Sequence, residues 1–466
     1  MKIIGVVLAA FMSLLTQPAK ADLKRYLYER HIHRQHEMLG FSALTTIETG
    51  EFDQKIDPTN AADTRTFKQK YFFDSTYAAG PNSPVLYIIC GEAKCTEDNM
   101  GGAAEAYARE FKTYRVSLEH RYYGGSQPFP AMTTENMKYL STENAIADLA
   151  TFQKSITQTK GLHGKWIVMG GSYSGSLSAY YRLKHPNLVV GSLASSAPVH
   201  AVANFEAYDL DVATVAGPAC AAAMRKVVAQ VEAGLSDPAQ LAKYKALFDA
   251  TAVKSDIDFL YVIADMGAMS IQYGFEDQFC SRLLAGDPLQ GYATAGKQIF
   301  DLFGTTAVED SFQGASSENP ADYMSSFGAR AWLYQSCTEY GYWQVAYHDP
   351  AVSVRSAKID LAYHNETCKK FFGLAPVDTN HINQNLYEPL LTAPASEILF
   401  TNGSTDPWSK LSLSKALGND TNPAFTFYQI EGGSHCSDLS VDSGSDSDSL
   451  KHARALFEQL VTGWLK

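Results

Sequence analysis

The serine at position 172 lies in a local pattern that is typical of a catalytic nucleophile. The hydrophobic residues 166–169 predict a buried strand, and the stretch 170–175, Gly-Gly-Ser-Tyr-Ser-Gly, follows it and opens a predicted helix. A strand, a sharp turn and a helix expose a serine hydroxyl at the turn, with the positive end of the helix dipole behind it. The pattern therefore predicts a nucleophile elbow, in which Ser174 stands where the motif G-x-S-x-G has its second glycine.

Two later residues could complete a catalytic triad with Ser172. A serine hydroxyl is a weak nucleophile, so it needs a histidine base whose tautomer is held by an acid. Asp406 and His435 each follow a predicted strand, and loops that follow parallel strands converge at one edge of a sheet. The order serine, aspartate, histidine is the one that α/β hydrolases use, and it predicts the triad Ser172, Asp406 and His435. Asp406 could instead cap a turn or a helix, and Asp438 is an alternative acid.

The developing oxyanion of such a reaction needs two backbone N–H donors. One should be the N–H of Tyr173, the residue after the nucleophile. The other should come from the loop after the predicted strand 84–89, and Glu92 or its neighbour is the expected donor there.

Six apolar runs rich in branched and aromatic residues predict buried parallel strands, with helices such as 142–155 between the earlier ones. These runs are 84–89, 114–118, 166–169, 189–193, 398–401 and 425–430. An amphipathic helix is predicted at 450–464. The middle of the chain is rich in alanine and helical in pattern. We therefore predict an α/β domain built from residues 22–202 and 396–466, with a helical cap inserted at 203–395.

Composition excludes several functions. The chain has 466 residues, of which 45% are hydrophobic, and its formal net charge is −12. No basic stripe occurs, so nucleic-acid binding is not expected. No paired C-x-x-C spacing occurs, so we expect no zinc site, no other metal and no cofactor.

The N-terminus has the three parts of a secretory signal peptide. Lys2 precedes an apolar run at 3–15, and Ala-Lys-Ala at 19–21 offers a cleavage site, so residues 1–21 are the expected signal. No further apolar run reaches the length needed to span a bilayer, so no membrane association is expected after cleavage. The mature chain would be secreted, lysosome-like or periplasmic, depending on its source.

Export permits disulfides and glycans. Seven cysteines occur, so at least one thiol has no partner within the chain. Glycosylation sequons begin at Asn365, Asn402 and Asn419, and their use requires a eukaryotic source.

Longer blocks of the chain resemble serine peptidase family S28, the group of prolyl carboxypeptidase, dipeptidyl peptidase II, thymus-specific serine protease and fungal prolyl endopeptidase. The resemblance spans about residues 30–465. It is carried by the blocks at 119–126, 139–150, 170–199, 335–341, 402–408 and 433–439. It implies an α/β-hydrolase domain with a helical cap, cleavage of peptides often next to proline, and the triad named above. It also implies a disulfide between Cys337 and Cys368.

The resemblance further points to three substrate-binding residues. Trp408 would form an aromatic wall for a proline ring, although core packing explains it equally well. Ser176 stands where exopeptidase members carry the methionine of their proline pocket, which puts proline preference in question. Glu339 matches an acidic residue that binds the substrate amine in dipeptidyl members, and a structural hydrogen bond is the alternative.

The sequence therefore predicts a secreted serine peptidase that forms an acyl-enzyme and acts on peptides or proteins. A lipase or esterase on the same fold is the alternative, and a non-catalytic binding protein is a third. Endo- or exopeptidase action and a homodimer are left open.

Overall fold

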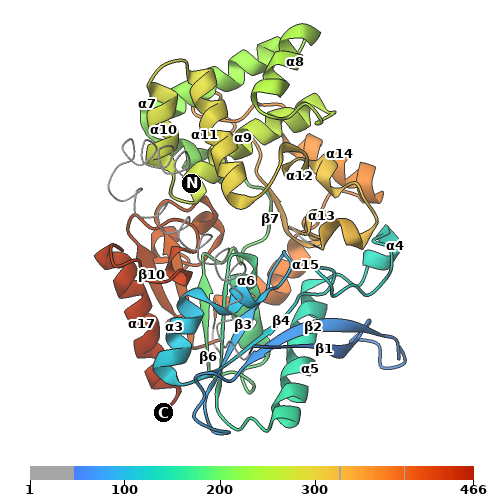
Figure 1. The fold of residues 1–466 in the computed structure, drawn as a ribbon, viewed down its shortest axis with the longest axis vertical. Coiled ribbons are helices and arrows are strands. Elements are labelled where there is room, and N and C mark those ends of the chain that lie inside the picture. Colours follow the sequence, from blue (N-terminus) through green and yellow to red (C-terminus); the bar gives the residue numbers. More distant parts are fainter. Residues whose placement is uncertain (1–46, 325–326, 393) are drawn as a thin grey trace, which may run out of the picture.

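The computed structural model describes residues 47–324, 327–392 and 394–466, and the expected signal peptide (1–21) lies outside them. The described chain is built around one eight-stranded sheet of order β1-β2-β4-β3-β5-β6-β9-β10 (Figure 1). β2 runs antiparallel to both of its neighbours, β1 and β4. The six strands from β4 to β10 in this order are parallel to one another. The strands are β1 Glu48–Lys55, β2 Thr66–Asp74, β3 Val85–Ile89, β4 Tyr114–Leu118, β5 Trp166–Gly171, β6 Gly191–Ser195, β9 Ile398–Gly403 and β10 Thr426–Ile430.

The six parallel strands are the six that the apolar runs predict, although some ends differ by one or two residues. The β1–β2 hairpin was not predicted. It lies at the edge of the sheet, and β1 is largely exposed, so it lacks the continuous apolar run that marks a central strand. Because β2 pairs with β4, the hairpin extends the sheet on the side away from β9 and β10.

Helices cover both faces of the sheet, because successive residues of a strand point to opposite sides. Leu86 and Ile88 of β3 pack in one apolar core with α3 and α17, whereas Tyr87 belongs to the other core, with α5 and α6. The covering helices are α3 Gly102–Phe111, α5 Thr142–Lys160, α6 Tyr173–Lys184 and α17 Asp448–Trp464. The predicted helices at 142–155 and 450–464 are therefore present, each somewhat longer than expected.

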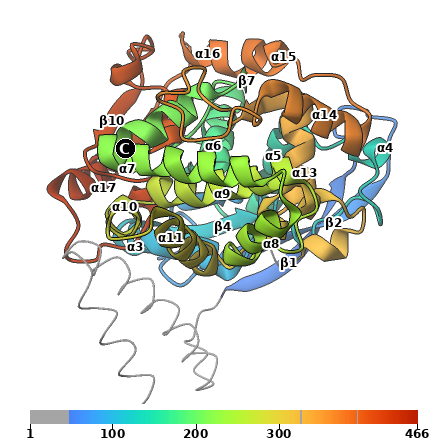
Figure 2. The same ribbon diagram turned by 90° about the horizontal axis from the view of Figure 1, so that it is seen from above.

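A helical region is inserted in the chain between β6 and β9. It lies beyond one end of the strands of the sheet (Figures 1 and 2). Its main helices are α7 Glu206–Gly234, α8 Pro238–Leu247, α9 Asp256–Gln272, α10 Glu276–Leu284, α11 Pro288–Phe303, α13 Ala329–Gln335 and α14 Leu361–Phe372. Cys220–Cys280 joins α7 to α10, and Cys337–Cys368, the pair that the family resemblance implies, joins the turn after α13 to α14. A mostly parallel sheet with this insertion is the expected α/β-hydrolase fold.

The expectation that no further apolar run is long enough to span a bilayer is wrong for one helix, by length and composition alone. Within the described residues, α7 is long and apolar enough to cross a membrane by length and composition. Its helical geometry is interrupted at Gly217, which is followed by Pro218, and residues such as Met224 and Val231 are buried against the rest of the protein. One side of α7 therefore packs against the protein, and apolar helices of a protein core pass the same test of length and composition.

A buried ion pair ties three parts of the fold together. Arg121, in the loop after β4, donates to both oxygens of Asp148 on α5 at 2.7 and 2.6 Å. Neither side chain is more than 1% exposed. The remaining guanidinium hydrogens reach backbone carbonyls, including those of Lys55 and Ile56 beside β1. All the charge of this pair is therefore met inside the protein.

We expect Asp148→Ala to destabilise the protein strongly, because it leaves the Arg121 guanidinium buried without its counter-ion. Losing one partner of a buried pair costs about 3–5 kcal/mol. Urea unfolding followed by tryptophan fluorescence measures this change. Glu135→Gln is the control, because it removes an exposed ion pair with Lys138 and should leave the midpoint almost unchanged. Equal midpoints for the two variants would contradict the prediction.

Candidate active site

Ser172 occupies a strained turn between β5 and α6. Its backbone has φ 57° and ψ −131°, a conformation that costs a non-glycine residue about 1–3 kcal/mol. The turn also demands close backbone approach: a Cβ on Gly170 would lie 2.2 Å from the carbonyl oxygen of Ser174. The predicted strand, sharp turn and helix are therefore present.

The hydrogen bonds of the Ser174 side chain account for the departure from the glycine motif. Its hydroxyl donates to the carbonyl oxygen of Gly171 at 2.7 Å, and it lies 3.1 Å from the Gly171 N–H, which it can accept. The serine thus satisfies backbone groups of the turn that a glycine would leave to other partners.

Asp406 and His435 lie at the ends of neighbouring strands, β9 and β10, and are joined directly. His435 Nδ1 lies 2.9 Å from Asp406 Oδ2, and the exposed fractions of the two residues are 8% and 0%. Because a carboxylate only accepts, this contact puts a proton on Nδ1 and leaves Nε2 for a second partner. The other oxygen of Asp406 accepts the N–H of Trp408 and caps a short helix, so the capping role also holds.

The histidine loop lies against the elbow through the end of β6. The N–H of Ser172 donates to the carbonyl of Ser195, and the N–H of Cys436 donates to the Ser196 hydroxyl, both at 2.9 Å. A Cβ on Gly171 would lie 2.8 Å from Cys436 Sγ. Among the described residues, the Ser172 hydroxyl makes no hydrogen bond to His435, and such bonds are often long without substrate.

The alternative acid, Asp438, does not contact His435. It accepts hydrogen bonds from Ser195 Oγ at 2.5 Å and Thr401 Oγ1 at 2.7 Å. These contacts join β6 and β9 beneath the histidine loop, so this buried carboxylate braces the loop instead of orienting the imidazole.

The two expected oxyanion donors lie on adjoining segments. Tyr173 is the first residue of α6, so the helix itself leaves its N–H unused. A Cβ placed on Gly91, which precedes Glu92, would lie 3.4 Å from Cβ of Ser174. The carbonyl of Glu92 accepts the N–H of Gly328 at 3.0 Å. Burial raises the pKa of the Glu92 carboxyl, and the His435 imidazolium opposes that rise.

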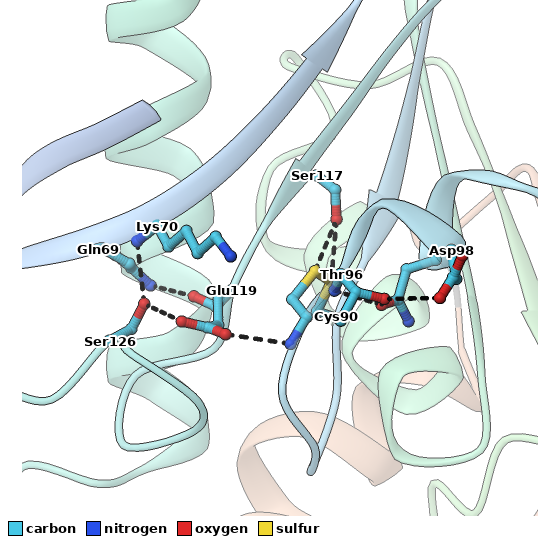
Figure 3. Close-up of a disulfide and its surroundings, with 10 residues drawn as sticks. Gln69, Lys70, Cys90, Thr96, Asp98, Ser117, Glu119 and Ser126 are labelled. Atoms are coloured by element: carbon cyan, nitrogen blue, oxygen red, sulfur yellow. Dashed lines mark hydrogen bonds between the residues drawn. A yellow bond between two sulfur atoms is a disulfide. The ribbon is translucent and has the colours of Figure 1, made fainter. Parts of the chain in front are cut away.

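The loop that carries Glu92 is closed by a disulfide between Cys90 and Cys95 (Figure 3). The buried carboxylate of Glu119 holds this loop, because it accepts the N–H of Cys95 at 3.1 Å and the hydroxyl of Ser126 at 2.7 Å. The loop therefore has a covalent closure and a charge-assisted anchor at the base of the site.

Comparison with known proteins identifies the family of this chain. A family model described as serine carboxypeptidase S28 matches residues 54–457. The chain belongs to peptidase family S28. It is a serine-type peptidase, and the matched residues include the elbow, both loops and the helical region.

Several known proteins are similar to the chain over most of its length. A probable serine protease EDA2 of Arabidopsis thaliana is 38% identical over 78% of this chain and 75% of its own length. The thymus-specific serine protease of Homo sapiens is 30% identical over 96% and 94%. The lysosomal Pro-X carboxypeptidase of Bos taurus is 27% identical over 88% and 87%. A solved serine hydrolase from Cycloclasticus zankles is 12% identical over 90% of this chain and 98% of its own, with a TM-score of 0.41.

The three expected substrate-binding residues of this S28 peptidase lie in different surroundings. Trp408 is half-buried beside the Asp406 loop, and its ring packs near Phe205 and Tyr342 at 5.4 and 5.5 Å between centroids. Ser176 is fully buried on α6, and its hydroxyl lies 3.5 Å from the carbonyl oxygen of Ser172 in its own helix. Trp408 therefore packs within an aromatic cluster, as the core-packing alternative also expects, whereas the Ser176 side chain has no exposed surface.

The carboxylate of Glu339 is engaged at the start of α5. Its carboxylate accepts the backbone N–H of Thr142 at 3.0 and 3.1 Å and the hydroxyl of the same residue at 2.8 Å. Thr142 begins α5, so the carboxylate faces the positive end of that helix. Burial raises the pKa of Glu339 to about 7, while the hydrogen bonds from Thr142 oppose the rise. These contacts match the structural hydrogen bond that the sequence left as the alternative.

Sequence reasoning missed the contribution of the helical region to this site. The Tyr273 ring lies edge-on to the His435 ring, with centroids 5.8 Å apart, and the carbonyl of Gln272 accepts the N–H of His435 at 2.9 Å. Both residues end α9, and no local motif distinguishes them. Cys436 is the one cysteine outside the three disulfides of the described chain.

The ionic contact of His435 should appear in the pH dependence of stability. Burial alone would lower the pKa of His435, but the neighbouring Asp406 carboxylate and Cys436 outweigh it and raise the pKa well above its ordinary 6.5. A raised folded-state pKa contributes stability that is complete below the unfolded value and is lost as pH rises through the folded value. The free energy of unfolding of the wild type should therefore be higher than that of His435→Gln, and this difference should be largest below pH 6.5.

Urea unfolding of both proteins between about pH 5 and about pH 9 measures this difference. Replacing His452, an exposed histidine on α17, with Gln is the control and should preserve the wild-type pH profile. A gap between wild type and His435→Gln that stays constant or widens with pH would contradict the prediction.

Proposed function

We propose that this S28 peptidase is secreted and cleaves peptides, with a preference for the bond after proline, through Ser172, His435 and Asp406. The main support for this triad is the buried contact of 2.9 Å between His435 Nδ1 and Asp406 Oδ2, together with the strained turn at Ser172. The contact orients the imidazole and leaves Nε2 free to take the serine proton.

The reaction follows the steps of acyl transfer. Ser172 Oγ attacks the scissile carbonyl carbon while His435 takes its proton, and the resulting oxyanion accepts the N–H groups of Tyr173 and Glu92. The carbon–nitrogen bond then breaks as His435 gives the proton to the leaving amine. Water, activated by the same histidine, hydrolyses the acyl-enzyme and restores the Ser172 hydroxyl.

A preference for proline is supported by the aromatic cluster around the partly exposed Trp408, beside the Asp406 loop. Trp408 is half-buried there, among the rings of Phe205, Tyr208 and Tyr342. A flat pyrrolidine ring packs well against an aromatic face, and one relative is named a Pro-X carboxypeptidase.

Secretion is supported by the three disulfides of the described chain, which persist in oxidising compartments. One relative is named a lysosomal Pro-X carboxypeptidase. We therefore propose an extracellular or lysosome-like location, reached by way of the signal sequence at 1–21.

Ser172→Ala should abolish peptide cleavage, with a loss in kcat of about 10⁴-fold or more, because the nucleophile is removed. Labelling by a fluorophosphonate probe should disappear as well. Ser174→Ala is the matched control, since that neighbouring hydroxyl hydrogen-bonds only the backbone of Gly171 and should remain compatible with labelling. Full labelling of Ser172→Ala would contradict the proposed nucleophile. Hydrolysis of acyl esters without any peptide cleavage by the wild type would favour an esterase instead.

A substrate with proline at the position immediately before the scissile bond should have a higher kcat/KM than one with alanine there, because the proline ring would pack on Trp408. Peptides that carry proline or alanine at this position, with free or blocked ends, measure the preference and the mode of cleavage together. Trp408→Leu should reduce the preference for proline by about 10-fold while alanine peptides are affected less. Equal kcat/KM for proline and alanine peptides in the wild type would refute the preference and leave the peptidase assignment intact.

A further inference from the structure

Gln272 connects the two loops that carry Asp406 and His435. Its backbone carbonyl accepts the N–H of His435 at 2.9 Å. Its side-chain oxygen accepts the indole N–H of Trp408 at 2.8 Å and the hydroxyl of Tyr208 at 2.8 Å. One residue of α9 therefore binds the histidine loop with its backbone and the aspartate loop with its side chain.

The bond to Trp408 acts close to the acid of the triad. Trp408 donates its backbone N–H to Asp406 Oδ1 at 3.0 Å, and the other oxygen of Asp406 binds His435. A shift of the Trp408 indole would therefore move the backbone that holds Asp406. The contacts form a closed ring from Gln272 through Trp408 and Asp406 to His435 and back to Gln272.

The residues after Gln272 fit the same loop closely. The Tyr273 ring meets the His435 ring edge-on. Gly274 has φ +79°, and a Cβ placed on it would lie 3.2 Å from Cβ of Ser434. The end of α9 is thus shaped to the histidine loop along three consecutive residues, and it comes from the helical region instead of the sheet.

The Gln272 side chain is suited to this task because it is buried and its oxygen is fully used. It is 6% exposed, so water does not readily replace its two hydrogen bonds. An apolar residue of similar size would leave the Trp408 and Tyr208 donors without their acceptor in a buried place.

We propose that Gln272 is a positioning residue for catalysis, which holds His435 and the Asp406 loop in register with Ser172 and does not itself touch the reacting atoms. The proposal rests on the proposed triad. It gives the helical region a role in turnover in addition to any role in substrate access.

Gln272→Leu tests this role. We expect kcat to fall by about 10–100-fold, because small displacements of reacting groups cost rate steeply, whereas KM should change less. Gln272→Glu retains an acceptor oxygen for both donors and should recover most of the lost kcat above the acidic limb of the pH profile. Both variants are compared at equal folded concentration, established by circular dichroism and thermal unfolding.

The pH profile of Gln272→Glu also provides a test, because structural damage alone would not shift its acidic limb. It adds a carboxylate to a site in which Asp406, Cys436, Glu92 and Tyr273 already interact electrostatically with His435. Extra negative charge favours the imidazolium, so the acidic limb of kcat/KM should move to higher pH.

Gln153→Leu is the matched control. Gln153 is also buried, accepts the hydroxyl of Tyr181 at 2.5 Å and donates to the carbonyl of Leu188 at 2.8 Å, but it lies on α5 away from the triad. Its loss should lower the melting temperature and leave kcat of the folded enzyme near the wild-type value.

The outcomes separate this proposal from the one it rests on. If Gln272→Leu keeps wild-type kcat while Ser172→Ala is inactive, the positioning role is wrong and the triad stands. A similar fall in kcat for Gln153→Leu, or no recovery and no pH shift in Gln272→Glu, would also overturn it. If Ser172→Ala remains active, the proposed triad itself fails.

Discussion

The buried contact between His435 and Asp406 is the interaction around which the site is organised. Both side chains are almost without exposed surface, so the charge of the carboxylate must be met by fixed partners and not by water. One oxygen is met by the imidazole and the other by the N–H of Trp408. This requirement explains why two loops from neighbouring strands, a short helix and the end of α9 converge on a single carboxylate.

The same physical rule governs the surroundings of the site. Glu119, Asp148 and Asp438 are buried carboxylates, and each is satisfied by bonds that join separate segments: the Cys90–Cys95 loop, the hairpin edge and the ends of β6 and β9. Burying such groups is costly, and a complete set of partners makes each of them a connection that tolerates little displacement. The rigid frame allows a serine in a strained conformation to be held at the end of β5.

Sequence reasoning succeeded where a structure depends on local residue order. The central strands are buried on both faces, so their apolar runs are continuous and could be recognised. The largely exposed strand β1 has no such run and could not be recognised. Ser174 was recognised as a departure from the glycine motif, but its bonds to Gly171 became visible only in three dimensions. The apolar character of α7 was underestimated because polar residues interrupt its runs.

By itself, the sequence determined the strand, turn and helix around Ser172, the order of the candidate triad and the family blocks, because these depend on neighbours in the chain. The sequence predicted Asp406 as the acid and left Asp438 as an alternative. The tertiary structure decided between them, since Asp406 contacts His435, whereas Asp438, only three residues away from it, binds Ser195 and Thr401. It also decided the partner of Glu339, which is 197 residues distant, and the role of Gln272, which is 136 residues from Trp408. Such hydrogen bonds form only after the sheet and the helical region have packed, and no periodicity or spacing in the chain records them.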